Sequence, residues 1–214
     1  WESRFKTKSW GKRGMRQTQE YAIANVSHMN INKYFGGSIL DFGCALGDAI
    51  TVYHSAFPNA FLSGFDLSET AIKKCKEKYG NIAEFNSGNF KGIKNQDVII
   101  ASHVMEHITD DRTIVKKLLL KCKEMFIFVP YKESPLYKEH VNYYEKNYYN
   151  NFNVLEKSVF FVDFKYKLSV NEIIKNLLKG RIVYEKQFLK EIVSFHIKGL
   201  LWKKTQIIQF NLFG

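Results

Sequence analysis

The sequence contains few residues that cross-link or interrupt a chain. Its 214 residues include 3 prolines and 3 cysteines, and Cys44, Cys75 and Cys122 show no metal-type spacing. A disulfide framework is therefore not expected, and a reducing cytoplasm is the default location. No apolar run approaches the roughly 20 residues that cross a bilayer, and no secretory leader is evident, so we expect no membrane span.

Acidic residues are scarce relative to basic ones. The 32 lysines and arginines outnumber the 21 aspartates and glutamates, which gives a formal charge of +11. Such a balance can attract nucleic acid, anionic lipid or phosphorylated substrates. Many of the lysines, however, alternate with apolar residues at helical spacing in 73–78 and 116–123, where they would only solvate helix faces. The charge alone leaves an anionic partner open.

The chain lacks internal repeats, low-complexity segments and linkers, so its length favours one domain over residues 1–214. Short apolar runs predict strands that alternate with amphipathic helices, at 38–42, 60–66, 82–87, 97–104 and 124–130 for the strands and 47–56, 68–79 and 110–122 for the helices. This alternation indicates an α/β fold with a parallel sheet and right-handed crossovers.

The two ends of the chain depart from this rhythm. Residues 14–34 predict an amphipathic helix, and after residue 130 we expect strands at 158–164 and 205–213 on either side of a helical stretch at 170–200. We therefore predict an N-terminal helical cap (1–35), a ligand-binding core (36–130), substrate-side loops and an insert (131–204), and a final strand (205–214). The insert at 166–203 is expected to form a substrate lid.

The turn from the first strand to the first helix carries the most informative motif, DFGCALGD at 41–48. Doubly wound folds bind nucleotide-like ligands at this position. A dinucleotide site would need G-x-G-x-x-G, but Ala45 and Asp48 occupy the second and third glycine positions. Carboxylates at Asp41 and Asp48 would also repel a pyrophosphate. They suit a ligand that carries an ammonium and a sulfonium group, as the methionyl part of S-adenosylmethionine does.

Two further segments suit the rest of such a ligand. Asp66 ends the second strand about 20 positions after Gly47, the spacing expected of an acid that binds ribose hydroxyls. Asn89 and Phe90 follow the third strand, where they could contact adenine, although an ordinary turn remains the alternative.

Histidine and glutamate gather at the end of the fourth strand, in ASHVMEHITDD at 101–111. His103, Glu106 and His107 lie where a central strand opens onto the binding edge of the sheet. A single histidine is more often structural than catalytic, and the cluster leaves both interpretations open.

Together these motifs resemble the class I S-adenosylmethionine-dependent methyltransferases, close to the small-molecule branch that includes ubiquinone and sugar methyltransferases. ILDFGCALGD and FDLSETAI resemble the family's first two motifs, and GNF and HVMEHITD resemble the segments after its third and fourth strands. Residues 36–130 carry the match, with weaker echoes at 129–131 and 140–144. The resemblance implies a Rossmann-like three-layer sandwich with a seven-stranded, mostly parallel sheet whose last strand is antiparallel.

The resemblance also assigns the parts of the cofactor, S-adenosylmethionine, to residues. It implies that the methionine moiety is framed by Asp41, Gly43, Cys44 and Gly47, the ribose held by Asp66 and Leu67, the adenine contacted by Asn89 and Phe90, and the region near the sulfonium lined by Ser102 and His103. Ala45 replaces the usual central glycine, and we expect altered loop geometry without loss of binding.

The acceptor is less constrained by sequence. No Asn/Asp-Pro-Pro-Tyr segment, Pro-Cys nucleophile or metal cluster is evident, which favours a hydroxyl acceptor without a metal. A base near neutral pKa would assist, and histidine suits that role. His107 beside Glu106 is the first candidate and His140 the second, although Glu106 and His107 could equally form a hydrogen-bonded pair that moves no proton.

Three functions compete. The favoured one is methylation of an oxygen of a small acceptor, which is a sugar, nucleotide-linked or phosphorylated metabolite and can be anionic; surface-polysaccharide components are included. The charge, 12 tyrosines and 18 phenylalanines support an RNA-directed methyltransferase as the alternative. A non-catalytic binding protein on the same scaffold is the third.

Overall fold

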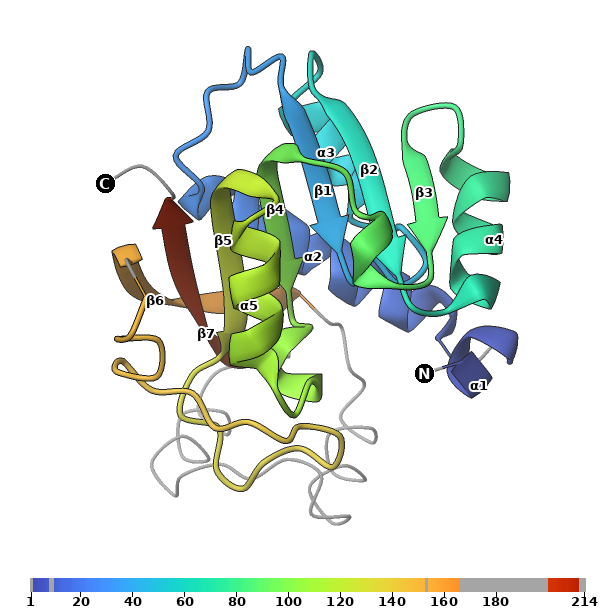
Figure 1. The fold of residues 1–214 in the computed structure, drawn as a ribbon. Helices are drawn as coiled ribbons and strands as arrows, with labels where there is room; N and C mark the ends of the chain where they lie inside the picture. The colour runs from blue at the N-terminus through green and yellow to red at the C-terminus, as the bar shows by residue number, and fades with distance from the viewer. Residues whose placement is uncertain (1, 8–9, 153, 166–199, 212–214) are drawn as a thin grey trace. The chain divides into compact units, whose positions relative to one another are not determined.

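The computed structural model describes residues 2–7, 10–152, 154–165 and 200–211 (Figure 1). The chain divides into two compact units, Trp1–Phe160 with Lys204–Gly214, and Phe161–Lys203. Every site residue expected from the sequence lies in the first unit. Almost all of the helical stretch expected at 170–200, and of the lid expected at 166–203, lies outside the described residues.

A seven-stranded sheet with the order β3-β2-β1-β4-β5-β7-β6 forms the frame. Its strands are β1 (Ser38–Phe42), β2 (Phe61–Asp66), β3 (Glu84–Ser87), β4 (Gln96–Ser102), β5 (Cys122–Pro130), β6 (Val154–Lys165) and β7 (Leu200–Asn211). Neighbours from β3 to β5 pair in parallel, and β7 pairs antiparallel to β5. The predicted fold class is therefore confirmed, including the antiparallel final strand.

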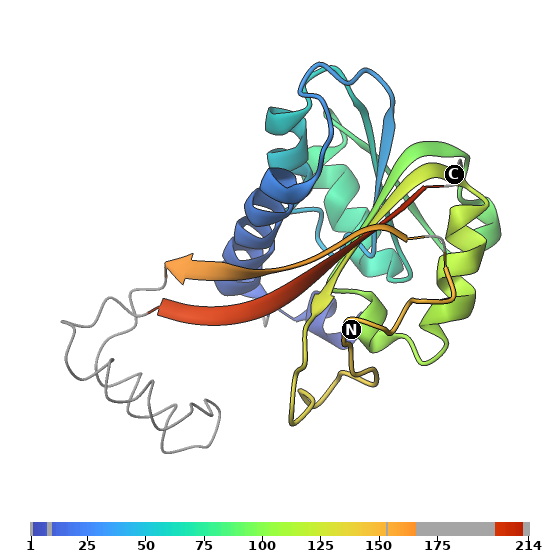
Figure 2. The same ribbon diagram turned by 90° about the vertical axis from the view of Figure 1, so that its left-hand side faces the viewer.

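The central strands have apolar, buried middle sections because helices cover both faces of the sheet. In β4, Ile99, Ile100 and Ala101 are fully buried, as is the run from Met125 to Val129 in β5. Figure 2 shows α2 (Gly11–His28) and α3 (Ile50–Ala56) on one face and α5 (Asp111–Leu119) on the opposite face. This arrangement is the three-layer sandwich expected from the sequence.

Polar side chains cap two of the helices, at the positions 68 and 110 where the sequence predicts that these helices begin. The Ser68 hydroxyl accepts a hydrogen bond from the Ala71 N–H at 3.0 Å and caps α4 (Glu69–Tyr79). The Asp110 carboxylate accepts from the Thr113 N–H at 3.3 Å and caps α5. These caps satisfy backbone donors that the first turn of a helix leaves open.

A short helix that the sequence analysis missed, α1 (Glu2–Lys6), packs beside α4. The Ser68 and Thr70 hydroxyls donate to the Glu2 carboxylate, and Lys74 Nζ donates to the Phe5 carbonyl. The N-terminal segment therefore lies against the loop that follows β2. Five residues were too few for periodicity to reveal this helix.

The segment after β5 is organised around a buried acid. Asp111 is 1% exposed, and its carboxyl group accepts hydrogen bonds from three tyrosine hydroxyls, those of Tyr144 (2.9 Å), Tyr148 (3.0 Å) and Tyr149 (2.5 Å). Burial raises the pKa of Tyr148 to about 12, and it raises the pKa values of the other two hydroxyls as well. This Asp111–tyrosine cluster anchors the 140–152 segment to the start of α5.

Two expectations about the chain's chemistry can be compared with the structure. Cys44, Cys75 and Cys122, all within the described part, are buried free thiols. No helix among the described residues has the length and apolar character needed to cross a membrane.

Candidate functional site

Because β1, β2, β3, β4 and β5 are parallel, the loops that follow them meet at one edge of the sheet (Figure 1). The loop after β1 is bonded directly to the end of β2. The N–H groups of Gly43 and Cys44 donate to the Phe65 carbonyl at 2.7 and 3.0 Å. The backbone is left-handed at Gly43 (φ 77°), Ala45 (φ 48°) and Gly47 (φ 73°). Ala45 thus adopts the conformation that glycine adopts without strain.

This conformation makes a prediction about Ala45. A left-handed backbone costs a non-glycine residue about 1–2 kcal/mol, and glycine loses about 0.4–1 kcal/mol more on folding. We therefore expect Ala45→Gly to raise the free energy of unfolding by about 0.5–1 kcal/mol, measured by urea denaturation. Ala24→Gly in α2 is the matched control and should lower stability by about 1 kcal/mol. Equal losses in both variants would contradict the strain at Ala45.

Asp66 holds the loop in place. Its Oδ2 accepts from the Ala45 N–H and its Oδ1 from the Ser68 N–H, both at 2.9 Å. Burial raises the pKa of this carboxyl, and the two backbone donors oppose that rise. A carboxylate has about four acceptor positions, so two remain for hydroxyl groups of a ligand.

The two other acids of the first motif differ in their surroundings. Asp41 is 4% exposed, and burial together with the nearby Asp66 raises its pKa to about 7. Asp48 is bonded to Lys78 Nζ at 3.0 Å and to the Tyr79 hydroxyl at 2.8 Å. The sequence suggested that both acids would favour a cationic ligand. Lys78, however, matches the charge of Asp48, so of these two acids Asp41 is the one whose ionised form a cationic ligand would stabilise.

The expected ribose and adenine contacts lie along the same edge. Leu67 is 66% exposed beside Asp66, and Asn89 is exposed after β3. Phe90 packs against Phe42 and Phe65, with ring centroids 5.6 and 5.9 Å apart, so part of its ring belongs to the core. Cys44 is buried with its thiol against Cys75, so it can offer a ligand only backbone.

The loop after β4 packs against the loop after β1. A Cβ on Gly43 would lie 2.3 Å from Val104 Cγ2, so the two loops touch. Ser102 Oγ accepts from Asn25 Nδ2 of α2 at 2.8 Å. His103 has a φ of 54°, and its ring lies 3.8 Å from that of Tyr21, also in α2. Sequence analysis missed Tyr21 and Asn25, because nothing in a helical pattern shows which loop the helix will face.

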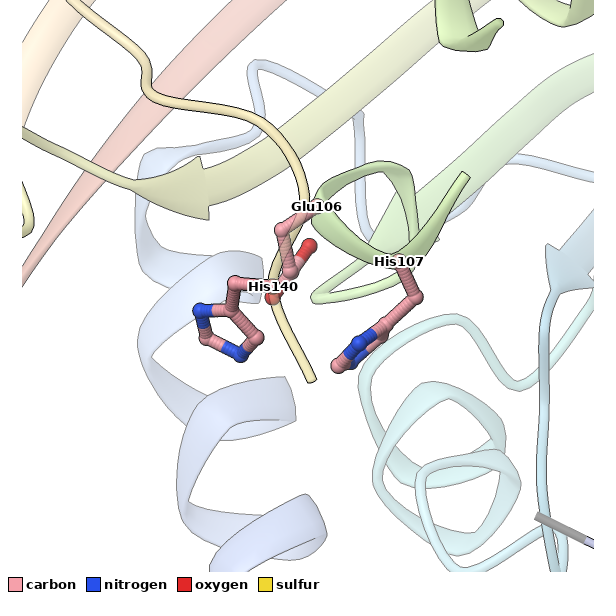
Figure 3. A group of neighbouring side chains, drawn as sticks. All are labelled: Glu106, His107 and His140. Carbon is pink, nitrogen blue, oxygen red and sulfur yellow. The ribbon is translucent and has the colours of Figure 1, made fainter. Parts of the chain in front are cut away.

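The structure brings both predicted bases together. The rings of His107, in the 3₁₀ turn Met105–His107, and His140, in the segment after β5, are 4.9 Å apart between centroids. Figure 3 shows Glu106 beside them. His107 Nδ1 lies 2.9 Å from the Glu139 carbonyl oxygen, and His140 Nδ1 pairs with the Glu133 carboxylate. Glu106, His107 and His140 are called the Glu–His–His cluster below.

Backbone and amide bonds fix the segment that carries His140. The Val141 N–H donates to the Glu106 carbonyl at 2.8 Å. Asn142 Nδ2 donates to the Met105 and Ile108 carbonyls at 2.9 and 2.7 Å. The weak motif echo at 140–144 therefore corresponds to a segment that docks on the turn containing His107.

A cavity of about 480 Å³ lies elsewhere, along β2 and β3 and toward the amino-terminal ends of β1 and β4. None of the expected site residues lines it. The loops at the carboxyl ends of the strands are the better candidate site, because ligands of open α/β sheets bind there.

A known protein family matches most of this chain. Residues 35–186, well over half of the chain, match the family model described as a methyltransferase domain. The chain belongs to the methyltransferase-domain family. It is a class I methyltransferase whose cofactor is S-adenosylmethionine, as the motifs predicted.

Solved structures share the fold of this methyltransferase. The plantazolicin methyltransferase BpumL, in complex with SAH, is 17% identical with a TM-score of 0.58, over 98% of this chain and 90% of that one. A putative methyltransferase in complex with the Haloferax volcanii Trm112 methyltransferase activator is 11% identical with a TM-score of 0.64, over 94% and 96%. Coclaurine N-methyltransferase, bound to N-methylheliamine and SAH, is 14% identical with a TM-score of 0.55, over 89% and 72%. At these identities the likeness shows the fold alone. No curated protein sequence matches the chain.

The residues at the edge fit the cofactor of this methyltransferase. Asp66 keeps acceptor positions for ribose hydroxyls, and the exposed Leu67 offers an apolar surface beside it. Burial without a matched cation disfavours the ionised form of Asp41, and a ligand that carries ammonium and sulfonium groups would restore that form, so Asp41 suits such a ligand.

Proposed function

We propose that this methyltransferase transfers a methyl group to an oxygen of a small acceptor that binds between the loop after β1 and the Glu–His–His cluster. The observation that carries the proposal is the position of the two imidazoles. Each has Nδ1 engaged by a protein oxygen, so Nε2 would be the nitrogen that serves an acceptor. The contact of Val104 with Gly43 joins the loop that contains His107 to the cofactor loop.

We assign to the cofactor residues the roles that the family resemblance implied. Asp41, Gly43, Cys44 and Gly47 would surround the methionine moiety, Cys44 through its backbone. Asp66 and Leu67 would hold the ribose. Asn89 and the outer edge of Phe90 would contact the adenine, and Ser102 and His103 would line the region near the sulfonium.

The chemistry required of the protein is then limited. Bound S-adenosylmethionine supplies an electrophilic methyl group on a good leaving group. The loops align the acceptor oxygen for in-line attack, in which a C–O bond forms as the C–S bond breaks. His107 or His140 accepts the hydroxyl proton through Nε2, because a neutral imidazole is a suitable base near neutral pH. The second product is S-adenosylhomocysteine.

The acceptor class comes from charge and from the absence of nucleic-acid motifs in the sequence. With a formal charge of +11, the chain suits an anionic acceptor such as a sugar phosphate or a nucleotide-linked sugar, including precursors of surface polysaccharide. Such precursors and three buried free thiols are compatible with a cytoplasmic protein.

An RNA acceptor is the alternative. The same charge supports it, as do exposed tyrosines such as Tyr34 (68%) and Tyr137 (56%), which could stack on bases. RNA binding of this kind would weaken steeply with salt.

An acceptor screen tests the proposal. The protein is incubated with S-adenosylmethionine and either sugar phosphates and nucleotide sugars or total RNA, and S-adenosylhomocysteine release is measured. Release that requires a hydroxylated metabolite, with a methyl ether found by mass spectrometry, supports the proposal. Release only with RNA supports the alternative. Cofactor binding without turnover on either pool would contradict both and favour a binding protein.

Asp41 makes cofactor binding pH-dependent. Its pKa of about 7 in the ligand-free protein means that most molecules carry a neutral Asp41 at pH 6. A cationic ligand favours the carboxylate, so binding should release a proton, and affinity should be about tenfold higher at pH 8 than at pH 6. Calorimetry in buffers of different ionisation enthalpy measures both quantities.

The Asp41→Asn variant is the control, and its affinity should depend much less on pH; the remainder would come from Asp66. The stability effect has the opposite sign. Because the folded-state pKa lies above the unfolded value of 3.8, the stability that the neutral Asp41 contributes is lost as pH rises from about 4 to about 7. Equal wild-type affinity at pH 6 and pH 8, without proton release, would contradict this account.

A further inference from the structure

We propose that the Glu–His–His cluster binds a divalent transition-metal cation. The cation site follows from the geometry of the three side chains alone. Its role in catalysis, described last, rests on the proposed function. From the sequence we expected no metal, because Glu106 and His107 lie far along the chain from His140 and show no recognisable metal-site spacing.

The three side chains are close enough to share one ion. The ligand atoms that Glu106, His107 and His140 offer all lie within 4.8 Å of one another. With metal–ligand bonds of about 2.1 Å, two ligands on opposite sides of an ion are about 4.2 Å apart. Small side-chain rotations would therefore close the site. In Figure 3 the side chains approach one another from the turn after β4 and from the segment after β5.

Glu106 has a buried oxygen that lacks a hydrogen-bond partner. Its side chain is 1% exposed, and Oε1 lies 3.2 Å from His103 Nδ1. Among the described residues, no group within hydrogen-bonding distance serves Oε2. An unsatisfied carboxyl oxygen in the interior is costly, and a cation bound between Glu106 and the two histidines would satisfy it.

Both histidines have the outer partners that metal-ligating histidines usually have. A backbone carbonyl, that of Glu139, holds Nδ1 of His107, and a carboxylate, that of Glu133, holds Nδ1 of His140. Such partners fix the tautomer and ring orientation so that Nε2 faces the ion. One catalytic base would need one oriented imidazole, so the paired arrangement favours a metal site.

The ligand set selects the kind of cation. Two imidazoles and one carboxylate suit Mn²⁺, Co²⁺ or Zn²⁺ better than Mg²⁺ or Ca²⁺, which prefer oxygen ligands. Three protein ligands also leave coordination positions open for an acceptor oxygen.

A cation here would change how the acceptor loses its proton. The acceptor hydroxyl, bound to the cation, would have a lowered pKa and would release its proton to water. The C–O bond would form and the C–S bond would break as before, and the cation would keep its oxidation state. His107 and His140 would then act as ligands, and the base role described above would apply only without a cation.

Direct cation binding tests this inference without any acceptor. Calorimetry with Mn²⁺ and with Zn²⁺, and the visible absorption of Co²⁺, should show one equivalent bound per chain. Glu106→Gln and His140→Ala should each weaken binding at least about tenfold, and Glu133→Gln about tenfold through loss of the outer partner. His54→Ala, on the exposed face of α3, should leave binding unchanged.

The outcomes separate this inference from the proposed function. S-adenosylmethionine binding by a protein that takes up no cation would overturn the metal site and leave the methyltransferase proposal intact. Cation binding by a protein that does not bind S-adenosylmethionine would support the site and remove its catalytic role. If a variant fails to fold, electron paramagnetic resonance of the Mn²⁺-loaded wild type decides, since two imidazole nitrogens should couple to the metal. A spectrum without nitrogen coupling would overturn the site.

Discussion

Replacing Asp66 by alanine is expected to weaken S-adenosylmethionine binding by about 10²–10⁴-fold, because the two charge-assisted hydrogen bonds that Asp66 would make to ribose hydroxyls contribute about 1.5–3 kcal/mol each. The same change removes the acceptor for the Ala45 and Ser68 N–H groups. The loop after β1 would lose its anchor as the ribose loses its partner, so both effects act in the same direction. Calorimetry with S-adenosylmethionine and S-adenosylhomocysteine measures the loss.

Two variants separate ligand contact from loop anchoring. Asp66→Asn keeps one acceptor oxygen and should bind with intermediate affinity. Glu69→Ala changes an exposed acid in the first turn of α4 and should bind like the wild type. If Asp66→Ala binds both ligands as tightly as the wild type, the loop after β1 is scaffold and the cofactor site lies elsewhere.

Replacing Asp111 by alanine is expected to lower the free energy of unfolding by about 3–5 kcal/mol, because it leaves buried hydroxyl groups without their acceptor. Tyr144 is 1% exposed and Tyr149 is fully buried, so water cannot replace the lost hydrogen bonds without rearrangement. Urea denaturation of the purified variant measures the loss, with thermal unfolding as a second probe.

The neighbouring acid provides a matched comparison. Asp110→Ala removes only the cap of α5 and should cost about 1 kcal/mol. Tyr149→Phe removes one hydroxyl and should also cost about 1 kcal/mol. A loss below about 1 kcal/mol in Asp111→Ala would show that the three hydroxyls find other partners, and that the cluster does not anchor the 140–152 segment.

The Asp111–tyrosine cluster and the Glu–His–His cluster are mechanically linked. Asn142 lies in the chain midway between His140 of one cluster and Tyr144 of the other. Its side-chain amide donates hydrogen bonds to the Met105 and Ile108 carbonyls, which fixes both neighbours. Weakening the Asp111 contacts should therefore disturb the position of His140 as well as stability. Cation binding by the Asp111→Asn variant measures this coupling, and a reduced affinity is expected.

The fold could be predicted from the sequence because its signals are local. Strands such as 38–42 and 97–104 contain apolar runs, as buried parallel strands require, and two of the helices start after Ser68 and Asp110, which cap their first turns. The predicted ends of several elements differ from the observed ones, and α1 was not predicted. This helix is too short to show periodicity, and it depends on contacts with α4.

The backbone geometry of the loop after β1 could also be predicted in part from the sequence, whereas its cofactor contacts stay a prediction. The backbone of the turn at 43–47 is left-handed at alternate positions, and Asp66 at the end of the next strand bonds to it. Both features belong to neighbouring parts of the chain, so local sequence can specify them. The expectation was less accurate where a side chain's partner lies far away. Asp48 was expected to face a ligand, but Lys78 and Tyr79 occupy it, and part of the Phe90 ring belongs to the core.

By itself the sequence determined the α/β order, the glycine-containing loop and the acid at the end of β2, because residues close in the chain specify all three. Only the tertiary structure decided that His107 and His140 lie 4.9 Å apart, that Glu106 is buried between neighbouring loops, and that Glu133 and Glu139 orient the two rings. These groups meet because the segment after β5 folds back onto the turn after β4 and is held there by Asn142 and the tyrosines around Asp111. The distance between two loops depends on how the whole sheet and its helices pack, so it cannot be predicted from the spacing of residues along the chain.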